Sequence, residues 1–507
     1  MAIPMFKHAQ LESVKAWIGD PERASLPLHV RIQRAIRQLV LEGALPVGKA
    51  LPASRALAAS LAVSRDTVEA AYGQLHAEGF IERRVGSGSF VSPRAQHLPA
   101  QPRGRKVKAP DEPPAISRRG QALCEEGGVH NFFVSRPFAP GVAETRNFPL
   151  QAWEKLQRQV FKEHGSQALQ PSSAQGTEPL RRAIADYVNL ERGAQATADR
   201  VLILTSSQQA FSLCAQVLAD AGDQVVIEDP AYHGVRKALG AAGLQCIAVA
   251  VDTDGMQVEQ IKGLAPHSRA VFLTPSHQFP TGVTLSLDRR LAVIEWARQQ
   301  RAWIIEDDYD SEFHYAGKPT ACVQGLDAHD RTVYIGTFTK SLFAGLRIAY
   351  MVLPPQLVEP MTAARTLLDG HTASLAQLTL ARFIEGGHFG AHVRLMRAIY
   401  AERRDALAAL VQAQLSDFLV ARVPAGGMQM PCVFTRPMPE EQVVKAAQAA
   451  GIDLLGLSGL YASSKGEAGL LMGFAAHTPG ELAMAVAKLA KVLRQVEPGQ
   501  GRATLPG

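Results

Sequence analysis

One lysine in this chain lies where it could hold an aldehyde that also carries a phosphate. Lys340 follows the apolar run Thr332–Gly336, lies between hydroxyl residues, and is followed seven positions later by Arg347. A lysine amine forms Schiff bases with carbonyl compounds, and an arginine fork together with the hydroxyl of Thr337 can bind a phosphate. The segment therefore predicts a covalently held, phosphorylated aldehyde cofactor. Taken alone, Lys340 would count as an ordinary surface lysine.

An acidic segment, Ile304–Phe313, begins in a second apolar run and reads Glu-Asp-Asp-Tyr-Asp-Ser-Glu from residue 306. A carboxylate at a strand end can keep a pyridine nitrogen protonated, so that the ring stays an electron sink. A nearby tyrosine can donate to the phenolate oxygen of the same ring. A solvated acidic turn or a cation site would use the same residue types, so this segment alone leaves three alternatives open.

Three further segments join an apolar run to a polar turn, as ligand sites at the strand ends of open α/β sheets do. Thr274–Gly282 contains His277, which could contact the same phenolate oxygen or be a hydrogen-bonded loop histidine. Thr205–Phe211 leads into a capped helix whose N-terminus can bind a phosphate. Glu228–Gly234 contains Tyr232, which could stack on a flat ring or be a structural aromatic.

Short apolar runs alternate with helical patterns between these segments. This alternation predicts an α/β domain with a mostly parallel sheet covered on both faces, and the residues after about 385 predict a smaller α+β subdomain. Helices are expected at Gln208–Ala219 and Leu287–Arg298. The expected strands are Val201–Thr205, Gln224–Glu228, Cys246–Val251, Ala270–Thr274, Trp303–Glu306, Thr332–Gly336 and Ile348–Leu353.

The N-terminal region predicts a helix-turn-helix followed by a hairpin. Pro27–Glu42 has apolar residues at helical spacing, and Ser54 and Ser64 are expected to cap two short helices joined at Ala62-Val63. Phe80–Val91 carries Gly-Ser-Gly at the tip of the expected wing. A helix N-terminus, hydroxyls and arginines can contact phosphates and base edges, although three-helix folds that bind no DNA also exist. The candidate DNA contacts are Arg55, Ser64, Arg65, Thr67, Arg84 and Gly86.

The charge distribution supports a polyanionic partner for this N-terminal region. Residues 1–110 hold 16 Lys and Arg against 8 Asp and Glu, and because the whole chain has a net charge of +6, the other 397 residues sum to −2. Residues 92–128 are rich in Pro, Arg, Lys and Gly, which predicts an extended basic linker.

Composition limits the class of protein. A hydrophobic share of 47% indicates a folded chain. The sequence lacks an apolar run long enough to span a membrane and a signal-peptide pattern, so we expect a cytoplasmic protein without membrane contact. The five cysteines are scattered and form no CxxC, so we expect reduced thiols and no metal site.

Two family resemblances follow from these segments. Residues 27–91 resemble the winged helix-turn-helix of GntR-family bacterial transcriptional regulators, through Leu51–Val68, Leu75–Ile81 and Gly86–Val91. Residues 129–490 resemble fold-type-I aminotransferases, which use pyridoxal 5′-phosphate (PLP), because the five polar segments occur in their order. The whole chain is similar to MocR/GabR-type regulators, which join these two parts.

The resemblance implies a domain layout and a role for each site residue. It places a winged helix-turn-helix at 1–91, the linker at 92–128, a fold-type-I PLP-binding large domain at 129–384, and a small subdomain with a C-terminal tail at 385–507. Lys340 would be the Schiff-base lysine, Asp307 would pair with the pyridine nitrogen, Tyr309 and His277 would meet the ring hydroxyl, and Tyr232 would stack on the ring. The phosphate would be bound by Arg347, Thr337, Ser207, Gln208 and Gln209, with Thr339 as a further candidate.

One position departs from the aminotransferase pattern. Those enzymes carry an arginine near the C-terminus that binds the substrate carboxylate, and Leu471 stands at the matching position here. A buried carboxylate without a cationic partner is costly, so capture of an α-carboxylate would need another cation, such as Arg236 or Arg365.

The sequence thus predicts a PLP-dependent transcriptional regulator that binds double-stranded operator DNA and senses PLP, an amine or an amino acid. The resemblance implies a head-to-tail homodimer. The alternatives are a catalytically competent aminotransferase with an appended DNA-binding domain, which Leu471 disfavours, and a sensor of PLP itself.

Overall fold

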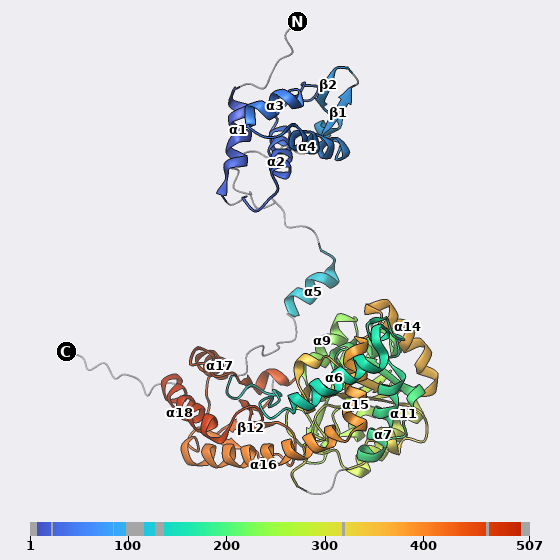
Figure 1. Ribbon diagram of the computed structural model, residues 1–507. Coiled ribbons are helices and arrows are strands. Elements are labelled where there is room, and N and C mark those ends of the chain that lie inside the picture. Colours follow the sequence, from blue (N-terminus) through green and yellow to red (C-terminus); the bar gives the residue numbers. More distant parts are fainter. Residues whose placement is uncertain are drawn as a thin grey trace, which may run out of the picture. The chain divides into compact units, whose positions relative to one another are not determined.

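The computed structural model describes residues 8–21, 24–84, 86–97, 116–126, 136–316, 320–462 and 466–497. The chain divides into two compact units, Met1–Ile116 and Ser117–Gly507, each described by itself below (Figure 1). Most of the predicted linker, the first residues of the predicted large domain and the end of the C-terminal tail lie outside the described residues.

The first unit is a helical domain with a two-stranded wing. Its core is apolar and includes Ile36 of α2, Leu57 of α3 and Tyr72 of α4, all of which are buried. The expected helices and hairpin are confirmed, and α1 is an additional helix that the sequence patterns did not indicate. The elements are α1 (His8–Gly19), α2 (Leu28–Leu41), α3 (Ser54–Leu61), α4 (Arg65–Ala77), β1 (Ile81–Arg84), β2 (Gly88–Val91) and η2 (Pro93–His97).

The turn between α3 and α4 follows from two local features. Ala62 ends α3 in the left-handed conformation, with φ of 55°. Ser64 is the N-cap of α4, and its hydroxyl accepts a hydrogen bond from the backbone N–H of Thr67 at 3.1 Å. The expected cap at Ser54 is wrong: Ser54 is already helical, and Ala53 is the N-cap without a side-chain hydrogen bond.

The second unit is built on an eight-stranded sheet with strand order β3-β10-β9-β8-β7-β4-β5-β6. Strands β9, β8, β7, β4 and β5 run parallel, whereas β10 is antiparallel to both β3 and β9. The seven expected strands are confirmed. The strands are β3 (Val201–Leu204), β4 (Gln224–Asp229), β5 (Gln245–Asp252), β6 (Gly255–Met256), β7 (Ala270–Leu273), β8 (Trp303–Asp308), β9 (Thr332–Thr337) and β10 (Ala349–Val352).

Both faces of this sheet are buried, which explains why its strands are continuous apolar runs. Along β3, Leu202 and Leu204 pack with α8, whereas Val201 and Ile203 pack with α7 on the opposite face. Figure 1 shows helices around the sheet. The helices of this part are α6 (Leu150–His164), α7 (Glu178–Arg192), α8 (Ser207–Leu218), α9 (His233–Ala241), α10 (Ile261–Leu264), α11 (Leu287–Gln300), α12 (Val323–Leu326), α13 (Phe338–Ser341), α14 (Val358–Asp369) and α15 (Ser374–Glu385).

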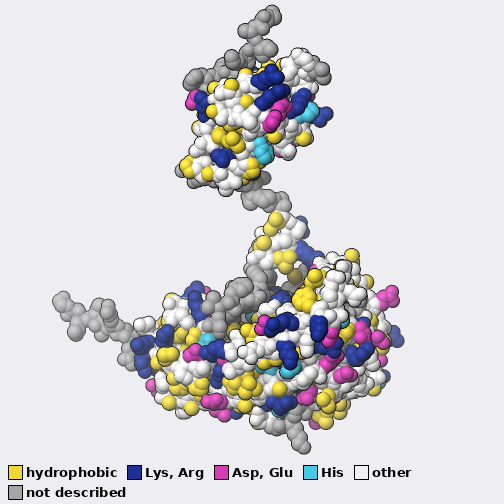
Figure 2. Space-filling view, viewed as in Figure 1, with side chains coloured by type: hydrophobic (Ala, Val, Ile, Leu, Met, Phe, Trp, Pro, Cys, Tyr) yellow, Lys and Arg dark blue, Asp and Glu magenta, His cyan; other side chains and the backbone are white. Residues whose placement is uncertain are grey.

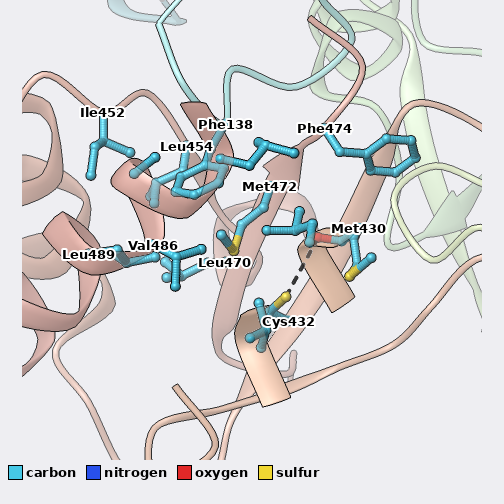
Figure 3. Close-up of a cluster of buried hydrophobic side chains, with 14 of the residues drawn as sticks. Phe138, Met430, Cys432, Ile452, Leu454, Leu470, Met472, Phe474, Val486 and Leu489 are labelled. Carbon is cyan, nitrogen blue, oxygen red and sulfur yellow. Dashed lines mark hydrogen bonds between the residues drawn. The ribbon is translucent and has the colours of Figure 1, made fainter. Parts of the chain in front are cut away.

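A smaller α+β part follows, as expected. An antiparallel sheet of order β11-β12-β14-β13 packs against long helices through a core that contains Met430, Leu470 and Met472 (Figure 3). Side chains alternate along β14, so Leu471 lies on the other face of this sheet. The elements are α16 (His388–Gln414), β11 (Leu419–Ala421), β12 (Gln429–Phe434), α17 (Glu440–Ala449), β13 (Leu455–Gly456), β14 (Gly469–Gly473) and α18 (Pro479–Val496).

The linker prediction needs one correction. The structure forms a helix, α5 (Arg118–Glu126), inside the segment that the composition predicts to be extended. Residues 118–126 contain Gln, Ala, Leu and Glu, which favour helix, and no proline after Pro114. The Pro content that suggested an extended chain is confined to the residues before this helix.

Candidate functional site

The polar segments singled out in the sequence meet at one edge of the eight-stranded sheet. Strands β4, β7, β8 and β9 run parallel, and β3 has the same direction because β10 is antiparallel to both β3 and β9. The carboxyl ends of all five strands therefore point to the same edge, where ligands of open α/β sheets bind.

Lys340 lies on α13, directly after β9, and its amine reaches a backbone carbonyl from a distant segment. Its Nζ donates to the carbonyl oxygen of Gly141 at 2.6 Å. Gly141 has φ of 67°, which favours glycine, and a Cβ there would lie 2.6 Å from Nζ and would displace the lysine amine. Burial lowers the pKa of the Lys340 amine, and the nearby carboxylates of Asp310 and Asp307 act in the opposite direction. Lys340 thus has a larger neutral, nucleophilic fraction than an exposed lysine.

Asp307 is the penultimate residue of β8 and is buried without a hydrogen-bond partner. It is 7% exposed, and its Oδ1 accepts no hydrogen bond from the described residues. Burial first, and then the neighbouring Asp308 and Asp310, raise the pKa of this carboxyl to about 8. An unpartnered buried carboxyl is unfavourable by itself. A protonated ring nitrogen would supply the missing donor, so this observation fits the cofactor that the sequence predicts.

His277 forms a buried pair with Asp310. The distance between its Nδ1 and Asp310 Oδ1 is 2.9 Å. The backbone of Gly426 and Gly427 packs on this pair: a Cβ on Gly426 would lie 2.0 Å from His277 Nε2, and one on Gly427 would lie 2.9 Å from Asp310 Oδ2. The contact between His277 and a ring hydroxyl stays a prediction.

Two tyrosines flank Asp307. The Tyr309 hydroxyl accepts a hydrogen bond from Gln429 Nε2 at 3.5 Å, and its pKa is well above the usual range because the phenol is buried and close to Asp310 and Asp307. Burial, followed by the charge of Asp307, raises the pKa of Tyr232 to about 12. Both phenols therefore stay protonated and can act as hydrogen-bond donors.

The predicted phosphate-binding residues occupy two helix starts and one turn. Ser206, not Ser207, is the N-cap of α8, and its hydroxyl accepts from the N–H of Gln209 at 3.2 Å. The side chains of Gln208 and Gln209 are bound to Gly234 and to Thr205, and the N–H of Gln209 is used by the cap. The backbone N–H groups of Ser207 and Gln208, at the first turn of α8, are therefore the ones that can bind a ligand here.

The second helix start belongs to Thr337, which caps α13 and shares a 2.9 Å hydroxyl contact with Thr339. Arg347 is exposed, has φ of 55°, and forms no hydrogen bond or ion pair with the described residues. Its guanidinium is therefore available to an anion.

The partners of two further buried acids, Glu228 and Asp308, were not predicted from the sequence. Glu228 accepts from Thr274 Oγ1 at 2.7 Å and from Gln278 Nε2 at 3.2 Å, and burial raises its pKa to about 7. Asp308 accepts from Arg192 Nε at 2.8 Å and from the Tyr334 hydroxyl at 2.6 Å. The acidic segment could have signalled a need for a buried cation, but no motif indicates Arg192, which lies at the end of α7.

Both cations proposed for a substrate carboxylate already have partners. Arg236 donates to the carbonyl oxygens of Tyr461 and Gly459, both at 3.1 Å. Arg365 is buried: its Nη2 donates to Thr372 Oγ1 and its guanidinium pairs with Asp369, while its Nε has no hydrogen-bond partner among the described residues. Leu471 is fully buried.

The candidate DNA contacts cluster at the start of α4, on α3 and in the wing. Arg55 and Arg65 are exposed near the starts of α3 and α4. In Figure 2, Lys and Arg side chains gather over the part of the first unit that holds α3 and the wing. Arg84 lies 4.5 Å above the ring of Phe90, and Gly86 at the wing tip has φ of 74°.

The hydroxyls at the start of α4 already have structural roles. Ser64 Oγ and Thr67 Oγ1 lie 2.7 Å apart, and the Ser64 hydroxyl also caps the helix. Each hydroxyl keeps a free lone pair or proton for a phosphate. A structural role and a DNA contact are therefore compatible at both residues.

Metal sites and membrane-spanning helices were also sought in the part of the chain that the structure describes. There, no group of three His, Cys, Asp or Glu residues is placed to hold a metal ion. No described helix is long and apolar enough to cross a membrane.

Comparisons with known proteins agree with this division into two parts. Residues 28–91 match the model for bacterial regulatory proteins of the gntR family, and residues 141–489 match that for aminotransferase class I and II. The crystal structure of a kynurenine aminotransferase from Pyrococcus horikoshii is similar with a TM-score of 0.67 and 25% identity, over 76% of this chain and 96% of that one.

Two curated relatives extend over both parts. The probable rhizopine catabolism regulatory protein MocR of Rhizobium meliloti is 32% identical over 90% of this chain and 92% of its own length. The pyridoxine biosynthesis transcriptional regulator PdxR of Corynebacterium glutamicum is 28% identical over 93% and 97%. This chain therefore belongs to the MocR-type transcriptional regulators, in which a gntR-family helix-turn-helix domain is fused to an aminotransferase class I and II domain.

Proposed function

We propose that this regulator holds PLP on Lys340 and that an amine or amino acid reaching the same site changes the affinity of the gntR-type domain for operator DNA. The observation that carries the proposal is Asp307, a buried carboxyl without a partner, beside a lysine amine of lowered pKa. The name of the relative PdxR, a pyridoxine biosynthesis regulator, supports a cofactor of the same chemical class.

Each site residue has a proposed task toward the cofactor. When bound, PLP supplies an electrophilic aldehyde carbon and an electron-accepting ring. Lys340 would bind the aldehyde carbon, and the Asp307 carboxylate would accept a hydrogen bond from the protonated ring nitrogen. Tyr309 donates to the ring oxygen with His277 nearby, while Tyr232 covers one ring face. The phosphate would be bound by Arg347, Thr337 and the backbone N–H groups of Ser207 and Gln208, while Gln209 would help to form this helix start through the capping contact with Ser206.

DNA binding is assigned to the first unit, which contains the gntR-type domain. A gntR-family domain implies DNA binding, and we propose that Arg55, Ser64, Arg65, Thr67, Arg84 and Gly86 make the contacts. We further propose a head-to-tail homodimer in the cytoplasm. If ligand and DNA bias one shared equilibrium, each must change the affinity for the other by the same factor.

Two other functions have specific support. Similarity to kynurenine aminotransferase favours some aminotransferase activity. Leu471, together with the existing partners of Arg236 and Arg365, disfavours it as the main role. The name of PdxR favours a sensor of PLP itself. A change in operator affinity on adding PLP alone would distinguish the sensor from an amine-responsive regulator.

Replacing Lys340 by Ala should abolish a visible absorption band that purified wild-type protein gains with PLP. The band requires a covalent link between the amine and the aldehyde carbon, which alanine cannot form. Lys445→Ala is the control, because Lys445 is an exposed surface lysine paired with Glu441. An unchanged band in the Lys340 variant would remove this lysine from its proposed role.

The stability of the PLP-free protein should depend on Asp307 in a pH-dependent way. The folded-state pKa of about 8 exceeds the usual 3.8, so ionising this carboxyl costs the folded state free energy as the pH rises from about 4 to about 8. We expect Asp307→Asn to raise the unfolding temperature at pH 8 and to raise it less at pH 5. Equal differences at both pH values in thermal unfolding would contradict the assigned burial.

Arg65→Ala should weaken operator binding by ~1–3 kcal/mol if Arg65 reads a base. Arg34→Ala, a change of an exposed arginine on α2 outside the helix-turn-helix, is the control. Affinities are compared at one salt concentration by fluorescence anisotropy with a duplex from the region beside the regulator's own gene. An affinity unaffected by the Arg65 substitution on every duplex tested would exclude Arg65 from readout.

A further inference from the structure

An apolar wall closes the side of the site that faces the small sheet. It consists of the buried side chains Phe279, Leu457, Leu460 and Leu471. Tyr232 and Tyr309 pack against these side chains, and the rings of Tyr232 and Phe279 meet edge to face at 5.4 Å. A ligand bound beside the two tyrosines therefore meets hydrocarbon on this side.

The apolar wall is fixed to the segment that carries Tyr232. Ala231 donates its N–H to the carbonyl of Leu460 at 3.1 Å, and Ala462 donates to Asp229 Oδ1 at 2.7 Å. The guanidinium of Arg236 donates hydrogen bonds to the carbonyl oxygens of Gly459 and Tyr461. Arg236 thus holds the wall in place, and its guanidinium is already bound to backbone carbonyls.

The charges around the wall oppose a second anion. Asp307, Asp310 and Glu228 are buried. The buried Arg192 is paired with Asp308, and Lys340 is engaged by the proposed cofactor. A carboxylate placed between the wall and these acids would lose water without gaining a cation from the described residues, whereas an amine without a carboxylate avoids this cost.

We propose that the ligand sensed here is a primary amine that has an apolar substituent and no carboxylate beside its nitrogen. This inference rests on the proposed function, because the amine must reach PLP on Lys340. It assigns Leu471 a specificity-determining role: a leucine at this position of β14 excludes amino acids and admits amines.

The test compares two ligands that differ only in the carboxylate. Full-length wild-type protein loaded with PLP is titrated with pentylamine and with norleucine, its carboxylated counterpart, by isothermal calorimetry. We expect pentylamine to bind at least ~10-fold more tightly. Equal affinities, tighter binding of norleucine, or no binding of either ligand would overturn the inference.

The visible absorption spectrum shows whether a negative result concerns only the amine specificity or also the proposed function. A normal Lys340-dependent band with a preference for norleucine overturns only the amine specificity. The absence of that band in the wild type overturns the proposed function as well.

A substitution pair tests the role of Leu471 directly. Leu471→Arg should shift the ratio of the two affinities toward norleucine by at least ~10-fold, because it adds the missing cation. Val420→Arg adds the same charge at an exposed position of the same sheet and should keep the wild-type ratio. An unchanged ratio in a folded Leu471→Arg protein, verified by circular dichroism, would refute the role; if that variant does not fold, the wild-type ratio decides.

Discussion

The cost of burying carboxylates at the end of β8 determines much of the second unit. Glu306, Asp307, Asp308 and Asp310 are all buried within a few residues of one another. Three of them receive protein partners: Glu306 accepts the N–H groups that begin α12 at 2.9 Å, Asp308 accepts Arg192, and Asp310 pairs with His277. Of these four, Asp307 alone receives no donor from the described residues. A carboxyl left unpartnered beside three partnered acids favours a ligand at that carboxyl, which is the role we propose for Asp307.

The same acids restrict the charge of a ligand that can bind at this site. Asp307 can accept a hydrogen bond from a protonated ring nitrogen, and none of these acids offers a partner to an additional carboxylate. The apolar wall acts in the same direction from the opposite side, because it offers a carboxylate neither water nor a cation. Electrostatics and packing thus agree on one class of ligand, which neither the fold nor the family membership determines.

The sequence was most informative where chemistry depends on neighbours along the chain. Continuous apolar runs predicted the strands because both sheet faces are covered, and polar residues after those runs predicted which side chains reach the sheet edge. The sequence did not identify Ser206 as the N-cap of α8, because Ser206 and Ser207 are adjacent and backbone angles decide which of the two begins the helix. Arg192 was missed because its partner Asp308 is close only in the fold, and helix α5 was missed because proline content was averaged over the whole segment.

The most direct test of the central claim is the protonation state of the PLP ring nitrogen, measured by ¹⁵N NMR with labelled cofactor in wild-type protein and in Asp307→Asn. If the Asp307 carboxylate binds the ring nitrogen, the wild type shows the shift of a protonated pyridinium at neutral pH and the variant shows that of a neutral pyridine. A neutral ring nitrogen in the wild type, or the same shift in both proteins, would contradict the account.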